Sequence, residues 1–113
     1  LLFIQIESIE AVNDVEEIIN FREIDGVLIG PYDISGSLGI PGQIHNRKVT
    51  QASNKIIKAC KKYKKSCGIH LVNVSKKNIN KILLQGFNIL TLSSDVFIFK
   101  DWTENISSII KKI

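Results

Sequence analysis

Residues 27–39 read VLIGPYDISGSLG, and the rest of the chain is best interpreted outward from them. The apolar run Val27–Ile29 has the composition of a buried strand, and Gly30 with Pro31 ends it in an abrupt turn. An acid, Asp33, follows directly beyond the carboxyl end of that strand. Ligands of parallel α/β folds bind at this end of the strands, so the turn is the first candidate for a functional site.

A second strand that carries polar residues lies upstream, at residues 1–7 (LLFIQIE). Because side chains of a strand alternate between faces, Gln5 and Glu7 share one face and the isoleucines beside them take the other. Polar side chains at the end of an apolar strand cost free energy unless something pairs with them. We therefore expect Glu7 and Asp33 to converge on one metal ion, with Gln5 helping to hold its ligand. The alternatives are an exposed strand-end acid at Glu7 and a turn-capping acid at Asp33.

The whole chain alternates between strand and helix patterns. The predicted strands are residues 1–7, 25–29, 67–72 and 87–92, and the predicted helices are 8–21, 47–65, 75–86 and 95–113. Such alternation indicates a parallel sheet with right-handed crossovers, and the apolar strands suggest burial on both faces.

The predicted class is therefore α/β, with four consecutive βα units. Four units are half of a (β/α)₈ barrel, which has about 250 residues. The chain opens on what reads as the middle of a strand, so we expect residues 1–113 to be one partial domain, strands and helices 5 to 8 of a barrel, with the earlier units absent. The rival, a small open doubly wound domain, lacks the Gly-rich dinucleotide turn after any strand.

Several local sequence patterns lead to further expectations. Asp14 with Glu17 three residues later has the shape of a capping box inside the first helix. The seventeen residues from Gly30 to Asn46 form a predicted loop long enough to suggest function. His70 should lie in its strand on the face opposite Ile69 and Leu71, and a core histidine bonded by a neighbour is favoured over a catalytic one.

Other polar residues have simpler interpretations. His45 is expected at the surface, and Ser94 and Asp95 are expected to cap the last helix. Cys60 and Cys67 are expected to be free thiols in a reducing cytoplasm, with a disulfide between them as the alternative.

The charge is unevenly distributed. Residues 1–46 hold eight acids and one base, whereas residues 47–113 hold three acids and fourteen bases. The lysines of residues 55–65 fall on the polar face of a predicted helix, without an aromatic strand on which bases could stack. A nucleic-acid partner is therefore not expected. Neither a membrane span nor a signal peptide is visible in the 113 residues, and we expect a cytoplasmic protein.

The two strand ends together carry a family resemblance. The motif Gln5-Ile6-Glu7, followed by DGVLIGPYDIS at residues 25–35 and Ser37-Leu38-Gly39, resembles the HpcH/HpaI family of class II, metal-dependent 2-keto-acid aldolases. These belong to the phosphoenolpyruvate/pyruvate barrel superfamily. The resemblance covers essentially the whole chain, as the carboxyl-terminal half of that barrel.

The resemblance assigns roles to six residues. Glu7 and Asp33 match the two metal carboxylates, and Gln5 matches a side chain that contacts pyruvate. Gly30, Pro31 and Tyr32 match the turn whose backbone faces the carboxylate of the keto acid, although the family usually has a small residue where Tyr32 stands. The family's catalytic His and Arg lie on earlier strands. No catalytic residue is therefore assigned within the chain, which is expected to be inactive by itself.

The implied activity is cleavage of a 4-hydroxy-2-keto acid to pyruvate and an aldehyde through a metal-stabilised enolate. Two carboxylates without clustered His or Cys favour Mg²⁺ or Mn²⁺ over structural zinc. The resemblance also implies a homo-oligomer in which the last helix, through Trp102 and the isoleucines at 106, 109 and 110, packs on a neighbouring barrel. The alternatives are a truncated, non-catalytic paralogue or binding module, and a citrate-lyase-type lyase acting on acyl-CoA.

Overall fold

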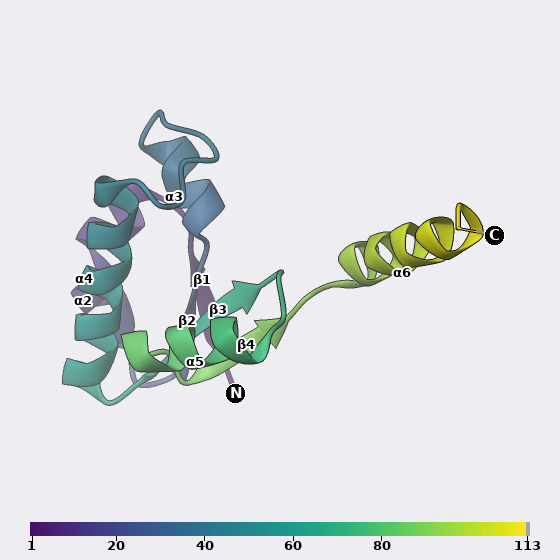
Figure 1. The fold of residues 1–113 in the computed structure, drawn as a ribbon. Helices are drawn as coiled ribbons and strands as arrows, with labels where there is room; N and C mark the ends of the chain where they lie inside the picture. Colours follow the sequence, from purple (N-terminus) through teal and green to yellow (C-terminus); the bar gives the residue numbers. More distant parts are fainter. Residues whose placement is uncertain (113) are drawn as a thin grey trace.

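The computed structural model describes residues 1–112 and contains one sheet with helices packed on one side of it (Figure 1). The four strands are parallel and lie in the order β1-β2-β3-β4, so the predicted α/β fold of successive βα units is confirmed. Ile113, the end of the predicted last helix, lies outside the described residues. The elements are β1 (Phe3–Ile6), α1 (Ile9–Asn13), α2 (Val15–Ile19), β2 (Gly26–Ile29), α3 (Pro31–Ser37), α4 (Arg47–Tyr63), β3 (Ser66–Leu71), α5 (Lys76–Gln85), β4 (Ile89–Leu92) and α6 (Asp95–Ile110).

The core fills the space between the sheet and helix α4. Ile6, Val27, Ile29 and Cys67 are buried on the same face of β1, β2 and β3. They pack in one cluster with apolar residues of the helices: Val12, Val15, Ile19, Ile34, Val49, Ala52, Ile56, Ile57, Ala59 and Cys60. The helical spacing of this stripe along α4 is what lets one helix cover two strands.

The opposite face of the sheet is not covered by helices within residues 1–112. Gln5, His70 and Thr91 are exposed on this face, and Leu28 is half-buried. The expectation that the strands are buried on both faces is therefore wrong for the described residues. We call this surface the open face; in a closed barrel it is the side that points inward.

The first predicted helix is divided into α1 and α2 at Asp14, the residue at which the capping box was expected. The capping box itself is wrong, because the Asp14 side chain makes no capping hydrogen bond. Asp14 is at once the C-cap of α1 and the N-cap of α2, and its backbone (φ −94°, ψ 9°) cannot take the extended conformation of an ordinary N-cap. Ser8 caps α1 instead, accepting a hydrogen bond from the backbone N–H of Ala11.

Both cysteines are free and buried, Cys60 on α4 and Cys67 on β3. A hydrogen bond between the two thiols raises the pKa of Cys67 and lowers that of Cys60, and burial raises the pKa of Cys67 further. Both therefore serve as small apolar side chains in the core.

Helix α6 projects away from the rest of the molecule (Figure 1). It exposes Val96, Phe97, Ile98, Phe99, Trp102, Ile109 and Ile110. The Cα radius of gyration is 16.4 Å, whereas a compact domain of this size has about 13 Å. No helix within residues 1–112 is both long and apolar enough to cross a membrane.

Candidate functional site

The carboxylates of Glu7 and Asp33 converge over Gly30 at the carboxyl ends of β1 and β2. The backbone N–H of Gly30 donates to the carbonyl of Ile6 at 3.0 Å, which extends the ladder between the two strands by one step. A Cβ built on Gly30 would lie 2.9 Å from Asp33 Oδ2, 3.1 Å from Glu7 Cγ and 3.6 Å from Glu7 Oε1. Both oxygens are thus within 3.6 Å of one point, at the same end of the sheet.

Gln5 orients Glu7. Its Nε2 donates to Glu7 Oε1 at 2.7 Å, because residues two apart on a strand share a face. Gln5 and Glu7 are both exposed on the open face. The amide therefore fixes Oε1, the oxygen of Glu7 that faces Asp33 over Gly30, and this oxygen keeps a second lone pair for a ligand.

The turn after β2 opens helix α3. Gly30 is its N-cap and Pro31 stands at the first helical position, where a missing N–H costs nothing. The first backbone N–H groups of a helix have no intrahelical partner, so those of Tyr32 and Asp33 are free to meet a ligand. The Tyr32 side chain is 59% exposed, and none of its atoms is among the three nearest to a Cβ built on Gly30. The predicted seventeen-residue loop is thus shortened by a seven-residue helix.

Two serines fasten this turn, and the sequence pattern did not reveal them. Ser35 is fully buried; its hydroxyl donates to the carbonyl of Tyr32 at 2.6 Å and accepts from the N–H of Gly42 at 2.9 Å. Ser37 Oγ accepts from the backbone N–H of Ile9 at 2.9 Å, which ties α3 to the start of α1. The segments that carry Glu7 and Asp33 are therefore held together. Only tertiary bonds reveal this role, because serine at such positions is equally common in solvated turns.

The two carboxylates suit a hard divalent cation. Within residues 1–112 neither Glu7 nor Asp33 forms an ion pair, so two negative charges face the same small space without a basic partner. A cation between them would relieve that repulsion, and carboxylate oxygens are the ligands of Mg²⁺ and Mn²⁺. The described residues hold no group of three or more His, Cys, Asp and Glu, so water and substrate would complete the coordination.

His70 differs from the expectation. It lies on the face opposite Ile69 and Leu71, as predicted, but it is exposed and its side chain makes no hydrogen bond within the described residues. The expectation of a core histidine assumed that both sheet faces are covered, and His70 lies on the open face.

His45 is at the surface, as expected, and Ser94 is the N-cap of α6, although its side chain makes no capping bond.

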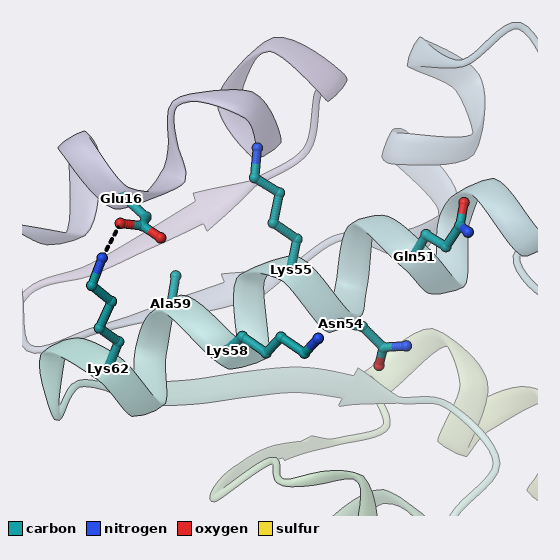
Figure 2. A pocket seen from close by; sticks show the side chains of 7 residues that line it. All are labelled: Glu16, Gln51, Asn54, Lys55, Lys58, Ala59 and Lys62. Atoms are coloured by element: carbon teal, nitrogen blue, oxygen red, sulfur yellow. Dashed lines mark hydrogen bonds and ion pairs between the residues drawn. The ribbon is translucent and has the colours of Figure 1, made fainter.

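A surface pocket lies away from this site. It measures about 430 Å³, sits on the outer helical layer and is lined by Glu16, Gln51, Asn54, Lys55, Lys58, Ala59 and Lys62 (Figure 2). Lys62 donates to Glu16 at 2.5 Å, and this bond holds the pKa of Glu16 below its usual value and raises that of Lys62. The pocket contains none of the residues around Gly30, and its charged side chains are solvated lysines with one paired acid.

The close contacts around Gly30 predict the effect of adding a side chain there. Gly30→Ala should weaken Mn²⁺ binding by roughly 10- to 100-fold, the range seen when groups beside metal ligands are changed, because the added methyl group displaces both carboxylates. Only mobile side-chain atoms oppose the methyl group, so stability should change by less than about 1 kcal/mol. Gly36→Ala in the same helix is the control, since a Cβ there meets no atom within 4 Å. Mn²⁺ titration checks both variants, and equal affinities would contradict the assigned geometry.

The family model for HpcH/HpaI aldolase/citrate lyase matches residues 1–101. The chain is 32% identical over 111 residues to the 5-keto-4-deoxy-D-glucarate aldolase of Klebsiella pneumoniae, covering 98% of this chain and 43% of the relative. It is 30% identical over 100 residues to the 2-keto-3-deoxy-L-rhamnonate aldolase of Escherichia coli O6:K15:H31, covering 88% of this chain and 37% of the relative. The chain thus spans about two fifths of the length of these relatives.

Solved structures agree with the sequence matches. An HpcH/HpaI aldolase from Desulfitobacterium hafniense DCB-2 superposes with a TM-score of 0.87 at 28% identity, covering 98% of this chain and 42% of that one. Citrate synthase SbnG shares the fold, with a TM-score of 0.84 at 22% identity over 99% of this chain and 45% of that one. The described residues are therefore part of a TIM barrel, and the chain belongs to the HpcH/HpaI aldolase/citrate lyase family.

Proposed function

We propose that this chain forms part of a metal-dependent carbon–carbon lyase that cleaves a 4-hydroxy-2-keto acid to pyruvate and an aldehyde. The observation that carries the proposal is the convergence of the Glu7 and Asp33 carboxylates over Gly30 at the carboxyl ends of two barrel strands. The names of the relatives, aldolases of deoxy keto sugar acids, support the reaction class.

The residues at the ends of β1 and β2 each have a role in this function. Glu7 and Asp33 hold a divalent cation, Mg²⁺ or Mn²⁺, which supplies a Lewis acid for the keto oxygen of the substrate. Gln5 orients Glu7 and contacts the keto acid from the same face. The backbone of Gly30, Pro31 and Tyr32 faces the substrate carboxylate, whose charge suits the unpaired N–H groups at the start of α3.

The remaining parts of the site come from outside the chain in this proposal. Residues 1–113 supply strands and helices 5 to 8 of the barrel, and a His and an Arg on earlier strands supply proton transfer and charge stabilisation. Residues 1–113 alone are then inactive. The buried free cysteines favour a reducing compartment, and the proposal places the protein in the cytoplasm.

The proposal also includes a homo-oligomer. An apolar stripe recurs at helical spacing along α6: Phe99, Trp102 and Ile109 are exposed and Ile106 is half-buried. The helix itself lies apart from the other described elements (Figure 1). A helix with such a face is stable in water when it packs against another surface. A neighbouring copy of the barrel is the partner proposed here.

The reaction is tested in a completed barrel, made by joining residues 1–113 to the part of the Klebsiella pneumoniae relative that precedes the matched segment. With Mn²⁺ this protein should exchange the methyl protons of pyruvate in D₂O and release pyruvate from a 4-hydroxy-2-keto acid. EDTA should stop both reactions and added Mn²⁺ should restore them. Residues 1–113 alone serve as the control and should show neither. Turnover that is unchanged by EDTA would contradict the proposal.

A further inference from the structure

Four residues form one row across the open face of the sheet. The strand register pairs His70 with Thr91 and Ile29 with Ile69, and it pairs Ile6 with Ile29. One step further along each strand, the same register places Glu7 beside Gly30 and Gly30 beside His70. The row therefore reads Glu7, Gly30, His70, Thr91, and His70 stands on the far side of Gly30 from Glu7.

The two residues at the far end of this row are both polar and unpaired. His70 and Thr91 are exposed, and neither side chain makes a hydrogen bond within residues 1–112. Their neighbours one step back on the open face, Gly68 and Ile89, offer no polar atom beyond the backbone. An imidazole and a hydroxyl side by side can each donate and accept one hydrogen bond.

His70 and Thr91 lie one and two strands beyond Gly30, on the side away from Glu7. Strands lie about 4.8 Å apart, so the Cα atoms of Glu7 and His70 are about 10 Å apart across Gly30. Gly30 has no side chain, and the Asp33 carboxylate reaches over it. Among residues 1–112, His70 is not part of a three-residue cluster of metal-ligating side chains. It borders the same space as the two carboxylates, on the side of Gly30 away from Glu7.

We propose that His70 is a specificity residue: its imidazole hydrogen-bonds a hydroxyl group on the part of the substrate that leaves as the aldehyde, with Thr91 beside it. This inference rests on the proposed function, because the carboxylate pair fixes where the keto-acid end of the substrate lies. The carbon chain of the substrate then extends from Gly30 along the row toward β3 and β4. An alkyl chain in that position would leave both polar side chains desolvated and unpaired, which disfavours aliphatic aldehydes.

The test compares two aldehydes that differ only in one group, glycolaldehyde with a hydroxyl and propanal with a methyl. The completed barrel is assayed in the direction of aldol addition to pyruvate. His70→Leu should lower kcat/KM for glycolaldehyde by roughly three- to ten-fold, the worth of one neutral hydrogen bond, and should leave propanal unchanged or improved. His70→Gln keeps a donor and should recover part of the loss, and Thr91→Val should show a smaller shift of the same sign.

Exchange of the pyruvate methyl protons in D₂O separates this inference from the proposed function. If His70→Leu retains exchange at the parent rate and shifts the ratio of kcat/KM for the two aldehydes, the inference stands. If exchange is retained but both aldehydes change equally or not at all, the His70 assignment is wrong and the proposed function survives. If the unsubstituted completed barrel shows no metal-dependent exchange, the proposed function fails and the inference fails with it.

Discussion

Glu7→Gln and Asp33→Asn are each expected to reduce pyruvate release by the completed barrel at least a thousand-fold. Each change keeps the shape of the side chain and removes one of the two negative charges that face each other over Gly30. A bound cation contributes several kcal/mol of charge stabilisation, and the rate falls ten-fold for about every 1.4 kcal/mol lost. Steady-state kinetics at saturating Mn²⁺ measures the effect, and circular dichroism checks that the fold is retained.

Two further variants act as controls for this result. Gln5→Ala removes the uncharged amide that donates to the Glu7 carboxylate and should cost roughly ten-fold, far less than the loss of a charge. Glu10→Gln removes another exposed acid, in the first turn of α1, and should have little effect. If Glu7→Gln turns over as well as the parent while Asp33→Asn is inactive, Glu7 is only a strand-end acid and the two-carboxylate site is wrong.

Trp102→Glu is expected to break up the assembly. Trp102 is 61% exposed at the centre of the apolar stripe of α6, where a charge would have to be buried against the neighbouring copy. Loss of a central aromatic contact typically costs 2 kcal/mol or more in an interface, which corresponds to roughly a 30-fold weaker association. Sedimentation velocity of the completed barrel over a range of concentrations measures the change.

Ser108→Glu is the matched control, because it adds the same charge to the polar face of the same helix. It should leave the distribution of oligomers unchanged. A parent protein that sediments as a monomer at all concentrations would contradict the proposed role of α6. So would an equal effect of the two substitutions.

The alternation of strands and helices was predictable because each element has its own hydrophobic period. Val27–Ile29 and the stripe of α4 are short-range signals, and they determine the parallel sheet once the handedness of crossovers is applied. The capping-box pattern singled out Asp14, where the predicted helix is divided. Its actual capping geometry was not predictable, because it depends on α2 beginning directly where α1 ends.

The site was only partly predictable for a similar reason. Glu7 and Asp33 stand at strand ends, so the topology alone brings them to one edge of the sheet. The bonds of Ser35 and Ser37 join segments that no periodic pattern relates, and the sequence did not predict them. His70 was misjudged because the burial of a strand face depends on what covers it, which a local pattern does not contain.

The most direct test of the central claim is anomalous diffraction from crystals of the completed barrel grown with Mn²⁺ and pyruvate. Our account predicts one strong manganese peak over Gly30, about 2.1 Å from one oxygen of Glu7 and one of Asp33. The keto oxygen and a carboxylate oxygen of pyruvate, together with water, should complete the coordination. A peak bound by only one of these side chains, or a peak away from Gly30 with pyruvate elsewhere, would contradict the account.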